Sequence, residues 1–221
     1  MAQTSFEVAR KAMIDSQIRP NKVIDERVVA AFAQTPRELF VPKALRDVAY
    51  VDEDISLAGG RYLIEAMVMG RILQALQLQS HHNVLLIGAG TGYTAALLSQ
   101  LCSSVIAIDN RAGAVEKTQE QLAQMEIGNV AVLKGKLTEG YASEGPYDAI
   151  VIEGGVETMP EALLEQLAAD GNCVAIWRTN STVQGEASIW SRAGTGFLRK
   201  SLFNAQVPTL SEFKAKPSFV F

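Results

Sequence analysis

The sequence has few of the residues that metal sites and nucleophilic hydrolases use. It contains two cysteines, Cys102 and Cys173, and two histidines, His81 and His82. The cysteines lie far apart in apolar stretches without a Cys-x-x-Cys or Cys/His ligand spacing, which indicates buried free thiols and no metal site. The histidines fall in a polar segment and are expected on a surface loop, which disfavours a Ser/His/Asp hydrolase.

Membrane and nucleic-acid signals are also missing. No apolar run approaches the roughly 18 residues that a membrane span needs, and the N-terminus lacks the basic and then apolar pattern of a signal peptide. The net charge is −4, whereas nonspecific nucleic-acid binding needs a basic surface. We therefore expect a cytoplasmic protein with neither a membrane nor a nucleic-acid partner.

The first third of the chain is predicted to be helical. Apolar residues fall on one helical face between Phe6 and Ile18, and Pro20 ends that segment. Asp25 is placed to cap a second helix, and Pro36 to open a short third one.

From residue 83 onward, short apolar runs alternate with helical segments. Buried strands are predicted at 84–87, 105–108, 130–133, 149–152 and 173–177, and helices at 93–101, 112–125 and 160–167. Such alternation predicts a doubly wound, mostly parallel α/β sheet. The segments 187–190 and 198–203 are predicted to close its edge as an antiparallel hairpin.

The most informative segment follows the first predicted strand and reads GAGTG, from Gly88 to Gly92. Glycines at a strand-to-helix turn let a ligand approach the backbone N–H groups closely. A dinucleotide fingerprint needs Gly-x-Gly-x-x-Gly, but Tyr93 occupies the position of its last glycine. The spacing Gly-x-Gly-x-Gly is instead typical of methyltransferases, whose ligand places a carboxylate and an amino group at this turn.

An acidic residue accompanies the glycine turn. Asp109 ends the second predicted strand, roughly 20 residues after the turn, where a carboxylate can accept both hydroxyls of a ribose. The combination of the two elements predicts an S-adenosylmethionine site. A tight turn and a helix cap without any ligand is the structural alternative.

The chain resembles the protein-L-isoaspartate O-methyltransferase family. Residues 84–98, VLLIGAGTGYTAALL, are similar to the family's first motif, including the tyrosine that follows the last glycine. Further segments agree with the family in order and spacing, namely 13–19, 25–28, 36–42, 44–50 and 147–150. The similarity extends over roughly residues 8 to 177.

The resemblance implies a Rossmann-like class I methyltransferase fold with an N-terminal helical extension and a C-terminal antiparallel hairpin. It implies one domain, with a helical part at 1–80 over the acceptor side and the cofactor-binding sheet at 81–221. The implied activity is a cytosolic repair reaction that methylates the α-carboxyl group of L-isoaspartyl residues with S-adenosylmethionine. The expected cofactor contacts are Gly88, Ala89, Gly90, Gly92, Asp109, Asn110, Lys136, Leu137 and Glu153. No catalytic residue is assigned, because a carboxylate nucleophile is already ionised at neutral pH.

The sequence departs from the family pattern at three positions. Leu63 stands where the family has an active-site serine, and Leu86 replaces an acidic residue of the first motif. Lys136 replaces the aspartate that meets the adenine amino group, and lysine cannot accept a hydrogen bond. The backbone N–H of Leu137 is still able to meet the adenine ring.

These departures leave three functions open. The first is an active isoaspartyl methyltransferase, the second a diverged methyltransferase with another acceptor, and the third a catalytically silent protein that binds S-adenosylmethionine. Tyr93 makes an oxidoreductase the least favoured class. The apolar terminus 217–221 is expected to pack as a last strand or to form an exposed tail that binds a partner.

Overall fold

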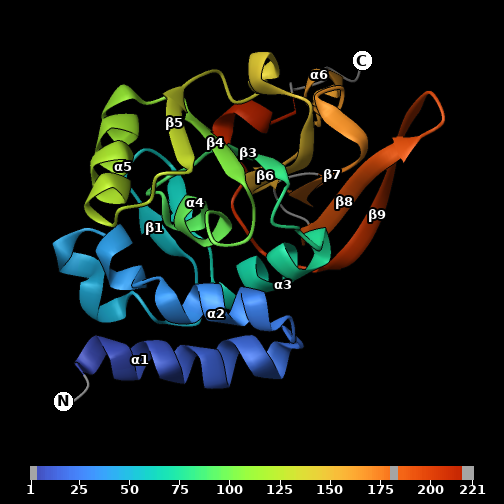
Figure 1. Ribbon diagram of the computed structural model, residues 1–221. Coiled ribbons are helices and arrows are strands. Elements are labelled where there is room, and N and C mark those ends of the chain that lie inside the picture. Colours follow the sequence, from blue (N-terminus) through green and yellow to red (C-terminus); the bar gives the residue numbers. More distant parts are fainter. Residues whose placement is uncertain (1–3, 180–183, 216–221) are drawn as a thin grey trace, which may run out of the picture.

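The computed structural model describes residues 4–179 and 184–215. A central seven-stranded sheet has helices on both faces, as Figure 1 shows. Its strands follow the order β5-β4-β3-β6-β7-β8-β9, and the first five of these run parallel. The strands β8 and β9 form an antiparallel hairpin at one edge, which confirms the predicted sheet and its closing hairpin.

The strand bounds agree with the predicted positions, although several strands are longer. The sheet consists of β3 (Asn83–Ile87), β4 (Ser104–Asp109), β5 (Val130–Lys134), β6 (Tyr147–Val156), β7 (Leu167–Trp177), β8 (Glu186–Ala193) and β9 (Gly196–Asn204). Because β7 already begins at Leu167, the helix predicted at 160–167 is reduced to α6 (Glu161–Leu164).

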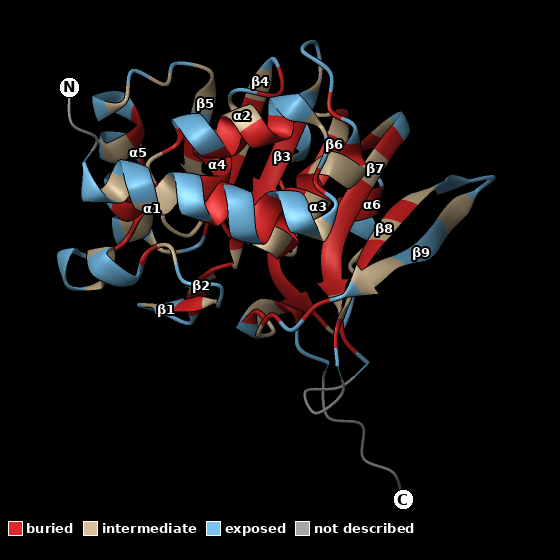
Figure 2. Cartoon of the chain, turned by 90° about the horizontal axis from the view of Figure 1, so that it is seen from below, coloured by how far each residue is buried: buried red, intermediate tan, exposed pale blue. Residues whose placement is uncertain are grey.

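Alternation along the strands divides the core between the two faces of the sheet. Leu85 and Ile87 of β3 belong to one cluster, together with Leu163 of α6. Val84 and Leu86 belong to the other cluster, which contains α4 (Tyr93–Leu98), α5 (Ala112–Gln124) and the N-terminal helices. Figure 2 shows the strands β3, β6 and β7 buried between these layers. A strand covered on both faces has no polar side, which explains its continuous apolar sequence.

Side-chain caps mark the starts of the first two N-terminal helices. In α1 (Ser5–Met13), Thr4 and Glu7 form a reciprocal capping box, and α1 continues into a π-helical turn and a 3-10 turn that contains Pro20. Asp25 caps α2 (Glu26–Gln34) by accepting from the N–H of Arg27, as predicted. A 3-10 helix follows Pro36 at Arg37–Phe40, and α3 (Ala66–Leu76) leads into the sheet.

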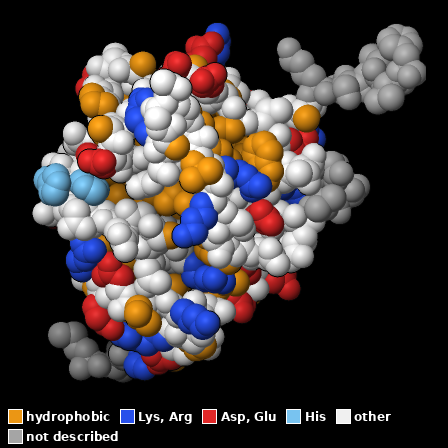
Figure 3. Space-filling model, turned by 90° about the vertical axis from the view of Figure 1, so that its right-hand side faces the viewer, with side chains coloured by type: hydrophobic (Ala, Val, Ile, Leu, Met, Phe, Trp, Pro, Cys, Tyr) orange, Lys and Arg blue, Asp and Glu red, His pale blue; other side chains and the backbone are white. Residues whose placement is uncertain are grey.

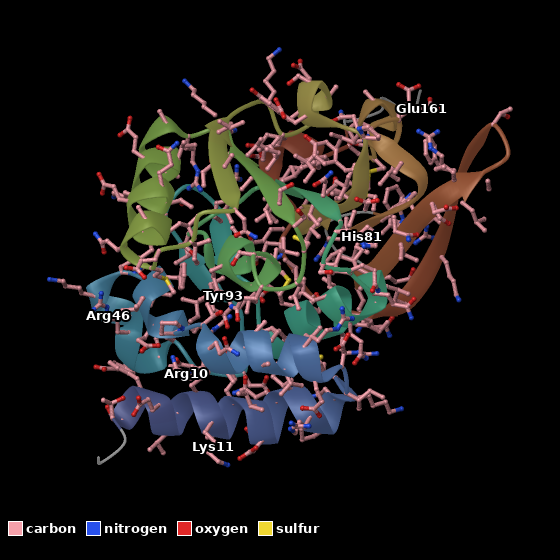
Figure 4. All side chains as sticks on the ribbon, in the orientation of Figure 1. Arg10, Lys11, Arg46, His81, Tyr93 and Glu161 are labelled. Atoms are coloured by element: carbon pink, nitrogen blue, oxygen red, sulfur yellow. The ribbon has the colours of Figure 1, made fainter. Side chains whose placement is uncertain are left out.

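Tyr93 attaches this helical layer to the start of α4. Its ring packs edge-on against Phe40 and Phe32, at centroid distances of 5.4 and 6.2 Å, and the Arg37 guanidinium lies over it. Figure 4 shows Tyr93 between α4 and the N-terminal helices, whereas Lys11 points away from them. The aromatic contacts therefore fix the helical layer beside the glycine turn.

One prediction for the N-terminal part was incomplete. Within the segment expected to be helical, β1 (Ile55–Leu57) and β2 (Arg61–Leu63) form a separate antiparallel hairpin. Its turn contains Gly59 and Gly60 with φ of 72° and 69°, values that glycine adopts readily. With three residues in each strand, the apolar alternation is too short to show in the sequence.

The expectations for cysteine and histidine are confirmed. Cys102 and Cys173 are buried and free. His81 and His82 lie in the turn that precedes β3 and appear at the surface in Figure 3. Within the described residues, no helix is both long and apolar enough to cross a membrane. The apolar segment 217–221 lies outside the described residues.

Candidate cofactor and acceptor site

The glycine turn lies at the C-terminal end of β3. Gly88, Gly90 and Gly92 have φ of 82°, 55° and 89°, so all three adopt the left-handed conformation that side chains disfavour. A Cβ atom on Gly92 would lie 2.6 Å from Cγ2 of Thr118 on α5, which adds a packing requirement there. Backbone conformation and packing thus account for the three glycines that the sequence singled out.

The turn exposes both donors and acceptors. The N–H groups of Gly88 and Ala89 donate to the carbonyl oxygen of Ile108 on β4, at 2.9 and 3.1 Å. Within the described part of the chain, the N–H groups of Gly90 and Thr91 have no acceptor, and the carbonyl oxygen of Gly88 has no donor. These three groups are therefore available to a ligand.

Asp109 lies beside the turn, at the end of the neighbouring strand, with 1% of its surface exposed. Its Oδ1 accepts from the backbone N–H and from Nε of Arg111, each at 2.9 Å, and its Oδ2 accepts from Nη2 of Arg111 at 3.0 Å. Nε of Arg61 is 3.4 Å from Oδ2. Burial alone would raise the pKa of Asp109, but the hydrogen bonds and charges of the two arginines lower it. Asp109 is therefore an ionised carboxylate with both oxygens engaged.

Arg61 joins three distant segments at this point. Its side chain is 3% exposed, and Nη2 donates to Oδ1 of Asn110 at 3.0 Å and to Oε1 of Glu212 at 3.2 Å. Asn110 also donates to Glu212, which belongs to a 3-10 turn at Ser211–Phe213. A ribose that donated its hydroxyl hydrogens to Asp109 would have to replace the hydrogen bonds that Arg111 and Arg61 now make to this carboxylate.

Glu153 lies in the C-terminal half of β6, on the opposite side of β3, and it differs from Asp109 in its partners. Its Oε1 accepts from Oγ1 of Thr94 at 2.7 Å, whereas Oε2 is buried without a partner in the described residues. Burial raises the pKa of Glu153 to about 8. Its effect outweighs the Thr94 hydrogen bond and the charges of Arg37 and Arg61, which lower the pKa. At neutral pH the ligand-free carboxyl group is largely protonated.

The C-terminal segment covers the ends of these strands. The N–H of Gly155 donates to the carbonyl of Pro208, and the N–H of Leu210 donates back to Gly155. Leu210 packs so closely on Gly154 that a Cβ atom there would lie 2.5 Å from Cγ of Leu210. The segment that carries Glu212 is therefore anchored on β6 beside Glu153.

Within the described residues, two further predicted cofactor contacts, Lys136 and Leu137, make no hydrogen bond or ion pair with Asp109 or Glu153. Lys136 projects into solvent with 76% of its side chain exposed and pairs with Glu139 at 2.7 Å. The side chain of Leu137 is buried in the core. A role for these two residues at an adenine ring stays a prediction.

Leu63, at the position of the family's serine, is also a core residue with 1% of its surface exposed. Its β2 neighbour Arg61 is the residue of this strand that reaches the glycine-turn region. Sequence reasoning did not assign Arg111 or Glu212 to the candidate site, and no motif in the sequence signalled either residue.

A pocket of about 510 Å³ adjoins the turn on the side of α5. Its walls are largely apolar and come from the 3-10 helix after Pro36, from β1 and from the first turns of α5. Its charged lining consists of Arg61, Arg111 and Lys117, and no carboxylate among the described residues lines it. An apolar pocket with several cations suits an organic anion.

Comparison with known proteins identifies the family. The sequence profile described as Protein-L-isoaspartate(D-aspartate) O-methyltransferase (PCMT) matches residues 8–187. This chain belongs to the protein-L-isoaspartate O-methyltransferase family. It is 37% identical over 166 residues to a protein-L-isoaspartate O-methyltransferase of Methanoculleus marisnigri, covering 75% of this chain and 76% of that protein. It is 39% identical over 171 residues to protein-L-isoaspartate O-methyltransferase 1 of Rhodopseudomonas palustris strain HaA2, covering 77% of this chain and 70% of the relative.

Solved structures agree on the fold. A protein-L-isoaspartate O-methyltransferase structure superposes with a TM-score of 0.79 at 22% identity, covering 91% of this chain and 66% of that one. A structure of the same type from Plasmodium falciparum, in complex with S-adenosyl-L-homocysteine, has a TM-score of 0.77 at 16% identity, covering 95% and 100%. Family membership makes this chain an S-adenosylmethionine-dependent O-methyltransferase with protein carboxylates as its acceptor class.

Proposed function

We propose that this chain methylates the α-carboxyl group of L-isoaspartyl residues, with the cofactor on the glycine turn and the acceptor in the adjoining cationic pocket. The observation that carries the proposal is the turn itself. Gly90 and Thr91 present N–H groups without acceptors, and buried carboxylates flank them at the end of β4 and in the C-terminal half of β6. Ligands bind at such strand ends in doubly wound sheets.

The glycine turn and Asp109 fit the cofactor's amino-acid end and ribose, respectively. The turn supplies N–H donors for a carboxylate, and Asp109 supplies acceptors for two hydroxyls once Arg111 and Arg61 release them. Arg111 is 29% exposed and keeps the carbonyl oxygen of Ala58 as a partner, and Arg61 keeps Asn110 and Glu212. We propose Gly88, Ala89 and Gly92 as turn contacts, and Asn110 as a neighbour of the ribose.

The chemistry needs little from the protein beyond position. The cofactor supplies a methyl group on a sulfonium centre, which is an electrophile. A carboxyl group titrates near pH 4, so the acceptor oxygen is already a nucleophile at pH 7 and no general base is required. The residues must align the acceptor with the methyl group and exclude water. Arg61, Arg111 and Lys117 would hold the acceptor by charge, because Leu63 cannot donate a hydrogen bond.

A cytoplasmic location and the lack of a nucleic-acid partner complete the proposal. The two free thiols and the net charge of −4 support them.

Methyl transfer to paired peptides tests the acceptor. One peptide carries L-isoaspartate, and its partner carries ordinary aspartate at the same place. We expect transfer to the isoaspartyl peptide only. The substitution Lys117→Ala should raise KM for this peptide about two- to fivefold, because it removes one exposed cation from the pocket. Lys134→Ala, on the exposed face of β5, is the matched control and should change nothing. Cofactor binding without transfer to either peptide would assign the chain a different acceptor.

A further inference from the structure

The space beside Gly90 contains two acceptor oxygens from different segments. A Cβ atom built on Gly90 would lie 3.5 Å from the carbonyl oxygen of Gly88 and 3.9 Å from Oε2 of Glu153. Apart from Gly90 itself and its chain neighbours Ala89 and Thr91, no other atom of the described residues comes within 4 Å of that point. Both oxygens lack a donor in the described part of the chain. Two acceptors without donors that meet at one point form a site for a hydrogen-bonding cation.

The donors of the same turn point to the rest of the ligand. The N–H groups of Gly90 and Thr91 are available, and backbone donors at a turn suit a carboxylate. Donors and acceptors thus adjoin within one turn. This combination matches an α-amino acid, which carries a carboxylate and an ammonium group on one carbon.

We propose that Glu153 is the anion that binds the α-ammonium group of the cofactor's amino-acid end, with the carbonyl oxygen of Gly88 as second acceptor. This inference rests on the proposed function, since it specifies how the same cofactor site recognises its ligand. Glu153 is 6% exposed, and Thr94 holds its other oxygen, so the free oxygen is directed at the turn rather than at solvent. A buried carboxylate without a partner is costly, and an ammonium group would satisfy it.

Binding of an ammonium group at Glu153 would displace a proton. In the ligand-free protein, burial holds Glu153 in its protonated form near neutral pH. The charged groups that act on it are Asp109 from β4, Arg61 from β2 and Arg37 from the 3-10 helix, and their effects partly oppose one another. Arrival of a cation favours the ionised carboxylate, so its proton leaves to solvent while the ligand stays an ammonium ion. Binding should therefore release about one proton per ligand at pH 6.5.

Calorimetric titration of the unmodified protein measures this proton. S-adenosylhomocysteine is titrated at pH 6.5 in two buffers with different ionisation enthalpies, and the difference in heat gives the number of protons exchanged. Release of about one proton is expected. Binding with no release, or with uptake, would overturn the assignment of Glu153. This measurement needs no variant, so it does not depend on how a substituted protein folds.

A pair of ligands isolates the ammonium contact. The second ligand is the analogue of S-adenosylhomocysteine in which hydrogen replaces the amino group. The unmodified protein should prefer S-adenosylhomocysteine about ten- to hundredfold, the scale of a hydrogen bond between charged groups. In Glu153→Gln the preference should fall to about threefold or less and proton release should vanish, while affinity for the analogue stays the same.

The matched control is Glu157→Gln. This carboxylate lies four positions further along the chain, also has a buried oxygen without a partner, and accepts from the N–H of Ala215. It should keep the full preference. A preference that survives Glu153→Gln would overturn the inference, even if that variant weakened the acceptor KM. If the unmodified protein binds neither ligand, the proposed cofactor site fails instead, and the two failures are distinguishable.

Discussion

Two buried carboxylates flank the glycine turn, and their surroundings set them apart. Asp109 at the end of β4 and Glu153 in the C-terminal half of β6 are 1% and 6% exposed. Asp109 receives hydrogen bonds from Arg111 and the charge of Arg61, and its pKa is lowered. Glu153 receives one hydroxyl hydrogen bond, and its pKa is raised to about 8. Burial acts to raise the pKa of both carboxyl groups, and only at Asp109 do hydrogen bonds and arginine charges reverse that effect.

The two carboxyl groups are therefore expected to bind a ligand in different ways. Asp109 is an anion that already has cationic partners, so a ligand there must exchange contacts. Glu153 lacks a cation, so a ligand there adds one. The ribose end of the candidate site is therefore closed by side chains, whereas the amino-acid end has its polar groups unsatisfied.

The largest effect is expected from removing the paired carboxylate. Asp109→Ala leaves the buried Arg61 without its partner on β4 and should lower the free energy of unfolding by about 3 kcal/mol. Chemical denaturation measures this change, and binding of S-adenosylhomocysteine should be lost. Glu26→Ala, which breaks the exposed pair with Arg19, is the control and should change stability far less. Equal losses in both variants would contradict the importance of burial at Asp109.

The second effect is a pH dependence of opposite sign at the two carboxylates. The folded pKa of Glu153 lies above its unfolded value, so the unfolded chain binds fewer protons between about pH 4.5 and 8. Its contribution to stability is fully present below that interval. It is then lost as pH rises, by at most about 1.4 kcal/mol per pH unit. The Asp109 contribution behaves in the opposite way and is lost as pH falls below about 4, because its folded pKa is lowered.

Denaturation of Glu153→Gln between pH 5 and 8 isolates the first of these slopes. The variant should match the unmodified protein near pH 5 and exceed its stability by about 2 kcal/mol at pH 6.5. Glu157→Gln, which changes another carboxyl group that has a buried oxygen without a partner, serves as the comparison. Parallel curves for Glu153→Gln and the unmodified protein would show that Glu153 ionises normally.

A smaller effect is expected from opening the ribose end. Arg61→Gln removes one of the cations that compete for Asp109 and should tighten S-adenosylhomocysteine binding about three- to tenfold. The same variant should raise KM for the acceptor, since Arg61 also lines the cationic pocket. Arg199→Gln on β9, in an exposed pair with Glu186, controls for the loss of a charge. Weaker ligand binding in Arg61→Gln would show that the guanidinium supports the cofactor directly.

The smallest effect is expected at Lys136, which follows the end of β5. Lys136→Asp introduces the acceptor that the family resemblance predicts for the adenine amino group. Because Lys136 is exposed and lies beside Glu139, the gain in affinity for S-adenosylhomocysteine should not exceed about threefold. Lys134→Asp is the neighbouring control. A loss of affinity would assign a positive role to the lysine itself.

Local patterns in the sequence determined much of the fold. The parallel strands, the glycine turn and the closing hairpin follow from apolar periodicity and from backbone conformations that glycine permits. The hairpin β1–β2 escaped prediction because three-residue strands carry too little alternation. The position of Leu63 in the core also escaped, since the resemblance placed an active-site residue there.

The sequence by itself determined that Asp109 ends a strand and that Glu153 follows the apolar run of another, both beside a ligand-binding turn, because apolar runs and turns are local features. Only the tertiary structure decided their partners. Arg61 meets Asp109 from 48 residues away, and Glu212 meets Arg61 across 151 residues. Such contacts depend on how the hairpin and the C-terminal segment pack over the sheet. The ionisation of a buried carboxyl group depends in turn on those contacts, so no local pattern could reveal that one was paired and the other free.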